Sequence, residues 1–329
     1  CREASGTKAG TLTLNMPKCT LMPYAIKGWE LWNSTEKWLL SSIGTRKVNG
    51  LSLAFTEEEE ELLYERVQAR QAMGAPIKLI SGKKAQRLEP GLNNSVRSAA
   101  WCAKDGFTSA YLTGHAFKRA LTQENSAVME YSKVKGIEND KNNFKIYLEN
   151  NEHLIAKRIV LAGGVWLEDM LSWLNVKIPI KCLINQLIIT ERMPQVMKTV
   201  LSIANGLLSL KQFDNGTVLI GGGWQGLGDK ERGGVEAIPE NLKGNIRLAC
   251  HVIPELCYGR MVRVWLGLEA ETADALPVIG NVPGISNAYV IGSVHSGYTS
   301  GPYMGWLLSQ FIMGQETEMS LFDPSRLIN

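Results

Sequence analysis

The chain has 329 residues, of which 45% are hydrophobic and 20% are charged, and its formal net charge is +3. This balance is typical of a globular protein and excludes a chain that is disordered throughout, while the length fits two domains. Lys and Arg are scattered among Asp and Glu, so the charge pattern gives no argument for binding nucleic acid.

The first quarter of the chain predicts a loop followed by helices and strands. Residues 1–17 are small and polar and are predicted as a loop, and from Tyr24 to Leu40 apolar residues recur at helical spacing. The alternation at Val48–Phe55 predicts a strand. Thr56 and Glu59 have the spacing of a capping box at the start of an acidic first turn, so a helix is predicted from there to about Met73.

The rest of the chain mixes strands and helices without strict alternation. This order favours a mixed α/β protein with two interwoven domains over a barrel. Further strands are predicted at Ile77–Ser81, Val128–Ile137, Asn143–Glu149, Arg158–Ala162, Gln186–Thr190, Thr217–Gly221, Met261–Leu268 and Ala288–Ile291, and helices at Leu112–Thr122 and about Pro302–Met313.

Two glycine-containing turns have features of a nucleotide site. Gly221, Gly223 and Gly226 form a G-x-G-x-x-G after a strand, but a loop-like sequence follows, so we expect a strand end without the helix N-terminus that a pyrophosphate needs. The strand predicted at Arg158–Ala162 runs into Gly163-Gly164 and then a helix, which is the form of a dinucleotide-fold turn and also of many ordinary αβ connections.

The segment from Ala275 to Gln315 contains no charged residue. Prolines, glycines and polar residues interrupt any run of about 20 apolar residues, so the segment does not predict a membrane span. We expect it to be buried against a large ligand, because charged side chains are normally interspersed on a surface. Its Gly- and Ser-rich part, His295–Pro302, offers backbone N–H groups to a carbonyl-rich ring or an oxyanion, although His295 fits a structural core histidine equally well.

Cysteine and histidine usage predicts no metal site and no disulfide framework. The six cysteines lack the two-residue spacing of zinc and redox motifs, and there are only four histidines. The first residues contain no apolar segment typical of a signal peptide, so a cytoplasmic location is expected.

Short motifs along the whole chain together resemble the D-amino-acid oxidase superfamily of FAD-dependent amine oxidoreductases, which includes glycine oxidase and sarcosine oxidase. Each motif is short, but their order agrees with that of the family. The matching pieces are Ala4–Gly10, Leu88-Glu89-Pro90, Asp105-Gly106, Leu161–Trp166, Gln186 and Thr190, Trp265–Gly280, the run HSGYTSGPYMGWLL that begins at His295, and the LFDPSRL run near the end.

The resemblance implies an α/β, two-domain flavoprotein with a dinucleotide-binding, glutathione-reductase-like domain and an antiparallel-sheet substrate domain. The FAD-binding domain would comprise residues 1–40, 106–180 and 262–329, and the substrate domain residues 41–105 and 181–261. The family places a strand, a glycine-rich turn, a helix and an acidic residue before the Ala4–Gly10 loop. Only three residues precede that loop here, so we expect the chain to be N-terminally incomplete, with this segment encoded upstream.

The resemblance also implies which residues bind FAD and substrate. FAD would be bound non-covalently, since no cysteine follows Cys257. The substrate-facing candidates are Trp265, Glu269 and Tyr298. The cofactor-binding candidates are Ser5, Gly6, Thr7, Lys8, Ala9, Gly10, Leu12, Val134, Ala162, Gly163, Trp166, His295, Ser296, Gly297, Tyr298, Thr299 and Ser300.

The implied reaction is oxidation of the C–N bond of a small amino acid or secondary amine, by hydride transfer to flavin and hydrolysis of the imine. Such chemistry belongs largely to the cofactor and demands no strong acid–base residue. Glu269 stands where several relatives have an arginine for the substrate carboxylate, and Arg263 could substitute only if it shares the side of the strand that carries Trp265. The alternatives are a dehydrogenase that passes electrons to a quinone or a partner, and a cofactor-free structural or partner-binding subunit of a heteromeric amine dehydrogenase.

Overall fold

The computed structural model describes residues 4–140, 143–231, 234–293 and 297–328. Their contacts divide the chain into two compact units, each built from separate stretches of sequence. The first unit comprises Cys1–Ala116, Ile184–Leu268 and Tyr298–Ser300, and the second comprises Phe117–Leu183, Glu269–Gly297 and Gly301–Asn329.

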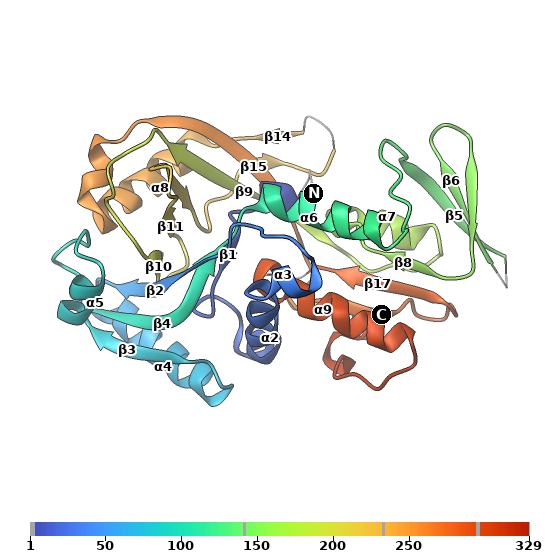
Figure 1. Cartoon of the computed structure of the whole chain (residues 1–329), viewed down its shortest axis with the longest axis horizontal. Helices are drawn as coiled ribbons and strands as arrows, with labels where there is room; N and C mark the ends of the chain where they lie inside the picture. Colours follow the sequence, from blue (N-terminus) through green and yellow to red (C-terminus); the bar gives the residue numbers. More distant parts are fainter. Residues whose placement is uncertain (1–3, 141–142, 232–233, 294–296, 329) are drawn as a thin grey trace. The chain divides into compact units, whose positions relative to one another are not determined.

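The first unit is built around a large sheet whose main path runs β1-β4-β2-β10-β11-β12-β9-β15, with β3 paired to β4 (Figure 1). The pair β2–β10 is parallel, whereas β4 pairs antiparallel with β1, β2 and β3. The strands are β1 (Thr11–Leu12), β2 (Arg46–Ala54), β3 (Ile77–Ser81), β4 (Ser98–Phe107), β9 (Lys181–Thr190), β10 (Val200–Ile203), β11 (Ser209–Gln212), β12 (Val218–Gly221) and β15 (Met261–Glu271).

Helices cover both faces of this sheet because successive strand residues point to opposite sides. Ala99 joins a core cluster with Ala249 and Val252 of α8 (Pro239–Val252), whereas Ala100 joins a cluster with Leu63 of α4 (Glu57–Ala72). Figure 1 shows α4 beside β3 and β4. The other helices that begin in this unit are α1 (Ala4–Thr7), α2 (Met22–Trp32), α3 (Thr35–Trp38), α5 (Gly82–Leu88) and α6 (Ala110–Gln123).

The second unit contains two three-stranded sheets around one hydrophobic cluster. In one sheet β5, β6 and β7 pair antiparallel, and in the other β17 pairs antiparallel with β16 and parallel with β8. Ile137, Leu161 and Val290 belong to the shared core. The elements are β5 (Val134–Asp140), β6 (Asn143–Leu148), β7 (His153–Ala156), β8 (Ile159–Leu161), α7 (Leu167–Ser172), β16 (Val278–Asn281), β17 (Ala288–Gly292) and α9 (Gly297–Ile312), of which Tyr298–Ser300 belong to the first unit.

Two local predictions are confirmed by their hydrogen bonds. Thr56 caps α4 by accepting from the Glu59 amide at 3.2 Å, and the Glu59 carboxylate accepts from the Phe55 amide at 2.9 Å. The G-x-G-x-x-G run leaves β12 and continues into β13 (Leu227–Gly228), which pairs with β14 (Val235–Glu236), so no helix begins there.

Other expectations were wrong. The predicted loop at residues 1–17 contains α1 and β1, and the long central strand β4 was not predicted. The charge-free segment is not uniformly buried: Val278 and Val290 are inaccessible, but the side chains of Trp306 and Met313 are 49% and 63% exposed. A helix presents one face to solvent, and on α9 that face carries uncharged residues instead of charged ones.

Helix α9 begins at Gly297, five residues before the predicted start at Pro302. Proline has no N–H to donate to the carbonyl four residues earlier, which is that of Tyr298. This carbonyl instead accepts a hydrogen bond from the Trp32 indole at 2.6 Å. The indole therefore compensates for the proline, and the helix continues through it.

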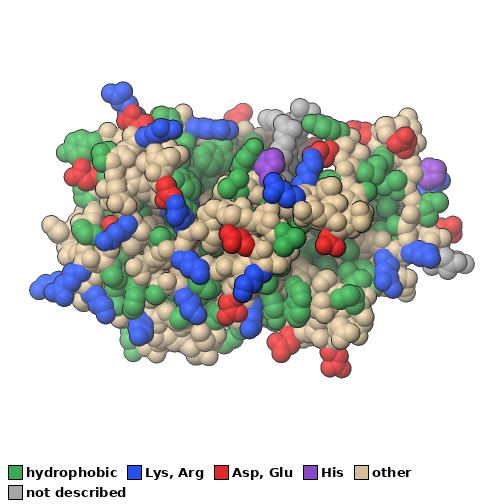
Figure 2. All heavy atoms as spheres, in the orientation of Figure 1, with side chains coloured by type: hydrophobic (Ala, Val, Ile, Leu, Met, Phe, Trp, Pro, Cys, Tyr) green, Lys and Arg blue, Asp and Glu red, His purple; other side chains and the backbone are tan. Residues whose placement is uncertain are grey.

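On the face drawn in Figure 2, basic and acidic side chains are interspersed with hydrophobic ones. Among the described helices, none is long and apolar enough to cross a membrane.

Candidate active site

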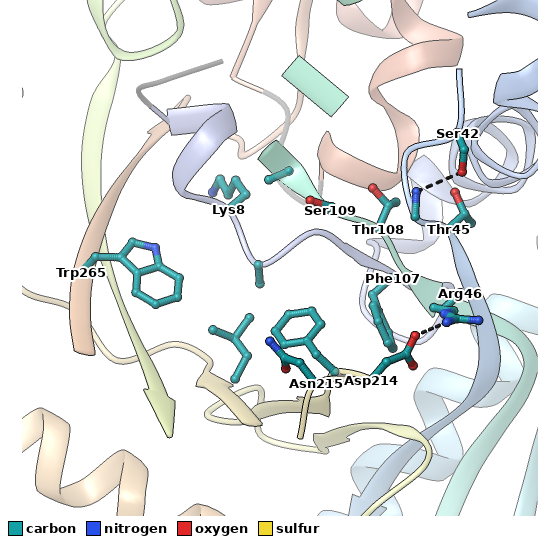
Figure 3. Close-up of a pocket in the computed structure, with 15 residues that line it drawn as sticks. Lys8, Ser42, Thr45, Arg46, Phe107, Thr108, Ser109, Asp214, Asn215 and Trp265 are labelled. Carbon is teal, nitrogen blue, oxygen red and sulfur yellow. Dashed lines mark hydrogen bonds and ion pairs between the residues drawn. The ribbon is translucent and has the colours of Figure 1, made fainter. Parts of the chain in front are cut away.

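A pocket of about 620 Å³ lies in the first unit (Figure 3). This volume is within the range of small-molecule sites in proteins. Figure 3 shows Trp265 and Arg46 on opposite sides of the pocket. The lining residues are Lys8, Ala9, Ser42, Gly44, Thr45, Arg46, Phe107, Thr108, Ser109, Ala110, Phe213, Asp214, Asn215, Leu219 and Trp265.

The pocket combines aromatic walls with a small number of charges. The rings of Phe107 and Phe213 meet edge to face, with centroids 5.5 Å apart. Arg46 forms an ion pair with Asp214, which Figure 3 marks with a dashed line. Arg46 neutralises the charge of Asp214. Because Lys8 adds a further positive charge, the lining residues have a net positive charge, which favours an anionic or zwitterionic ligand.

The segment predicted to cradle the flavin is held against β15 and β4. The Trp265 indole donates to the Thr7 carbonyl at 2.9 Å. Gly10 has a φ of +67°, and a Cβ there would stand 2.2 Å from the Thr108 carbonyl oxygen. Glycine is therefore required by both backbone conformation and space at this point. The backbone of Lys8 and Ala9, which line the pocket, is therefore held in one position.

Asp105 on β4 anchors the chain that follows this segment. Its carboxylate accepts from the Thr13 hydroxyl at 2.7 Å, the Leu14 amide at 2.9 Å and the Asn15 amide group at 3.2 Å. The side chain is completely buried, and burial raises the pKa of Asp105 to about 6 although these hydrogen bonds oppose the shift. A Cβ on Gly50 would stand 1.9 Å from this carboxylate, so glycine makes room for it.

The first turn of α9 is packed into the same unit. The ring of Tyr298 stacks on Trp32 with centroids 5.2 Å apart, and its hydroxyl lies 2.8 Å from the Thr113 hydroxyl. Burial raises the pKa of Tyr298. The Thr13 amide donates to the Thr299 hydroxyl at 3.2 Å, which connects this turn to the Asp105 network.

The residues present fit the flavin end of FAD, which carries ring carbonyls and nitrogens that accept hydrogen bonds. The first turn of α9, a helix of 16 residues, supplies backbone N–H groups without intrahelical partners. Ser300 in that turn is 2% exposed, and its hydroxyl is without a hydrogen-bond partner among the described residues. An unsatisfied buried hydroxyl in the first turn of a helix is a group that a carbonyl-rich ligand would complete.

The predicted site residues fall into two groups. Ser5–Gly10, Leu12, Trp265, Tyr298, Thr299 and Ser300 lie in the first unit, and Trp265, Lys8 and Ala9 line the pocket. Tyr298 does not line it. The second unit holds Val134, Ala162, Gly163, Trp166, Glu269 and Gly297, whereas His295 and Ser296 lie outside the described residues.

In the second unit β8 is followed by a glycine turn and then a helix, the order predicted from the sequence. β8 ends at Leu161, and Gly163 precedes a short 3-10 turn that leads into α7. A Cβ on Gly163 would stand 2.2 Å from the Met170 sulfur, so the turn packs tightly on the helix. Val134 packs on the core that contains Leu161. Glu269, on β15, is half-buried.

The side chain of Arg263 lies on the same side of β15 as that of Trp265. Its guanidinium carbon is 5.9 Å from the centre of the Trp265 ring. Arg263 is exposed and does not line the pocket.

Sequence reasoning missed several residues at the pocket. Arg46, Phe107 and Phe213 lie on elements far apart in the chain, and no motif joins them. Lys211 is buried beside the pocket, although a lysine in a short strand normally predicts a solvated face. The described residues contain no group of three or more His, Cys, Asp or Glu side chains arranged to hold a metal ion.

Comparison with known proteins identifies the family. A family described as FAD dependent oxidoreductase matches residues 1–311. The chain is 25% identical to one of the subunits of opine oxidase from Rhizobium meliloti, over 86% of its length and 75% of the relative's. It is 24% identical to the HcnC subunit of hydrogen cyanide synthase from Pseudomonas aeruginosa over 80% of its own length, and it spans only 63% of that relative.

Solved structures of other proteins have the same fold. The chain superposes on glycine oxidase from Geobacillus kaustophilus with a TM-score of 0.90 at 22% identity, covering 99% of this chain and 90% of that one. For L-proline dehydrogenase from P. horikoshii the TM-score is 0.89 at 20% identity, with 98% and 87% covered. The mixed α/β fold predicted from the sequence is confirmed. Since the family match extends over nearly the whole chain, this protein belongs to the FAD-dependent oxidoreductase family.

Proposed function

We propose that this protein oxidises the C–N bond of a small amino acid or secondary amine, and that the pocket of the first unit receives the substrate. The observation that carries the proposal is that Lys8 and Ala9, from the predicted flavin segment, line the same pocket as Trp265, the predicted substrate-facing residue. Relatives whose names specify glycine oxidase and opine oxidase support an amine as the substrate.

The chemistry that FAD supplies when bound is acceptance of a hydride from the carbon that bears the nitrogen, after which water hydrolyses the imine. The protein would orient the amine and keep the site dry. Trp265, Phe107 and Phe213 would pack on its apolar part, and Lys8 would favour its carboxylate. No proton-transfer residue is required by this scheme.

The residues proposed to bind FAD occur in both units. In the first unit, Ser5–Gly10, Leu12 and the α9 turn from Tyr298 to Ser300 would hold the flavin end through backbone amides and the Ser300 hydroxyl. In the second unit, Val134, Ala162, Gly163 and Trp166 would flank the nucleotide. The division into an FAD domain of residues 1–40, 106–180 and 262–329 and a substrate domain of the remainder belongs to the same proposal.

The experiment that tests the function is anaerobic mixing of the FAD-loaded protein with a panel of amines. We expect loss of the visible flavin absorbance with at least one amine that carries a carboxylate. Reoxidation by oxygen, compared with reoxidation by an artificial electron acceptor, then distinguishes an oxidase from a dehydrogenase.

A second candidate is that the protein works as one chain of a larger, heteromeric enzyme. Two of its relatives are named as subunits, one of opine oxidase and one of hydrogen cyanide synthase. In that case the purified chain would bind FAD and yet turn over slowly with oxygen. Co-purification from its own cells, followed by light scattering, measures whether a further chain is bound.

A further inference from the structure

Lys211 is a buried lysine whose ammonium group lies behind the wall of the pocket. It is 1% exposed and belongs to β11. Its Nζ donates to the Ala9 carbonyl and, at 2.6 Å, to the Thr11 hydroxyl. The same Nζ is 5.7 Å from the centre of the Phe107 ring and 5.9 Å from that of Phe213. Rings at these distances stabilise a cation through their π faces.

The residues next to Lys211 form one wall of the pocket. Ala9, Phe107 and Phe213 line the pocket, and so does Leu219, which pairs with Lys211 across β11 and β12. Lys211 does not line the pocket. Its charge is therefore one layer of residues away from a bound ligand, across apolar groups that screen charge far less than water does.

The positive charge of Lys211 is not neutralised by an ion pair with any described residue. The charged groups on β2, on β4 and on the pocket-lining segments around it are Lys8, Arg46, Lys47, Lys104, Asp105 and Asp214. The ammonium groups of Lys47 and Lys104 lie over the Trp29 ring. Asp105 is bonded to Thr13, Leu14 and Asn15, and Asp214 is paired with Arg46. Burial lowers the pKa of Lys211 to about 7, which expresses the cost of this unpaired charge. An anion in the pocket would offset that cost.

We propose that Lys211 is a positioning residue that makes the pocket select substrates bearing a carboxylate, by placing a positive charge behind the wall formed by Ala9, Phe107, Phe213 and Leu219. This deepens the proposed function and rests on it, since it takes this pocket as the substrate site. The substrate class is then an amine with an acid group that reaches this wall.

The test measures binding by titration calorimetry on the FAD-loaded protein, with 3-phenylpropionate and its uncharged amide as probes. The variant Lys211→Gln removes the charge but keeps an N–H donor for the Ala9 carbonyl, and Lys211→Arg keeps the charge. The matched control is Lys243→Met, which removes an exposed lysine on α8 of the same unit.

We expect the wild-type protein to bind the carboxylate about tenfold or more tightly than the amide. Lys211→Gln should reduce that preference several-fold, leaving only the part that Lys8 supplies, while its affinity for the amide stays unchanged, and Lys211→Arg and Lys243→Met should keep it in full. A purely structural role would weaken both probes alike. Equal carboxylate preference in wild type and Lys211→Gln would overturn the proposal.

If Lys211→Gln does not fold, the wild-type protein still provides a test. Carboxylate affinity should fall between pH 6.5 and 8.5, where lysines with an ordinary pKa do not titrate, and amide affinity should stay constant. A constant carboxylate affinity over this range would contradict the proposal. Neither result depends on flavin reduction, so failure of the amine panel would reject the proposed function and leave this test standing.

Discussion

Asp105 is a buried carboxylate that holds the Thr13–Asn15 stretch, which follows the pocket-lining residues Lys8 and Ala9 in the chain. Three donors from the Thr13–Asn15 stretch converge on it, and Gly50 gives it room. The same stretch contacts the first turn of α9 through Thr299. Asp105 therefore stabilises both the segment beside the pocket and the turn proposed to meet the flavin.

Stability should depend on pH through Asp105. Its folded pKa, about 6, lies above the ordinary value of 3.8, so its contribution to stability is full below about pH 4 and is lost as pH rises through 6. Between pH 4 and 7 the free energy of unfolding of the wild type should fall by about 2 kcal/mol relative to Asp105→Asn, which cannot titrate. Denaturant titration of both proteins at the two pH values measures this. A difference independent of pH would show that the pKa of Asp105 is not raised in the folded protein.

Glu269 should make simple amino acids such as glycine and D-alanine poor substrates. The resemblance implies that several amino-acid-oxidising members of the superfamily carry arginine here, and a carboxylate brought against another carboxylate is repelled. We expect Glu269→Arg to speed flavin reduction by D-alanine about tenfold or more. Glu240→Arg, an exposed change on α8, is the control. Rapid reduction of the unaltered protein by glycine would contradict this prediction.

Helix and strand boundaries that depend on neighbouring residues were predicted correctly from the sequence. The Thr56 capping box fixed the start of α4, and β3 has the predicted bounds, because caps and alternation act within a few residues. The start of α9 was misplaced because the bond that satisfies the Tyr298 carbonyl comes from Trp32, which is distant in sequence. β4 was missed because its run of small and polar residues has no clear alternation, although its position inside the sheet buries much of it.

The crossing of α2 and the start of α9 depends on Gly28. A Cβ at Gly28 would stand 2.1 Å from the Thr299 carbonyl oxygen and 2.8 Å from the Ser300 Cα. Because both are backbone atoms, Gly28→Ala should displace this turn and lower stability by about 1–3 kcal/mol. If the turn holds flavin, FAD content should fall as well.

The matched control for Gly28→Ala is Gly305→Ala within α9, where an added Cβ meets no atom within 4 Å. This change should be neutral or stabilising by about 0.5–1 kcal/mol, because alanine favours a helix over glycine. Thermal melts and the ratio of flavin to protein absorbance report both effects. Equal FAD content in the two variants would place the cofactor away from this turn.

For the whole molecule, the family and the mixed α/β fold were predictable, because ordered short motifs occur along the whole chain. The pocket was not predictable. Its walls come from Lys8, Arg46, Phe107, Phe213 and Trp265, which only the folded sheet brings together. The burial of Lys211 could not be predicted from the sequence, because burial of a lysine depends on the tertiary structure.

In the proposed reaction a carboxylate-bearing amine gives up a hydride from the carbon that bears its nitrogen. The decisive experiment is anaerobic stopped-flow mixing of the FAD-loaded protein with glycine, D-alanine, sarcosine, L-proline and an N-carboxymethyl amino acid. We predict rapid loss of the visible flavin absorbance with at least one of the larger carboxylated amines, slowed by deuterium on the reacting carbon. Flavin that stays oxidised with every amine, or a reduction rate insensitive to that deuterium, would contradict the account.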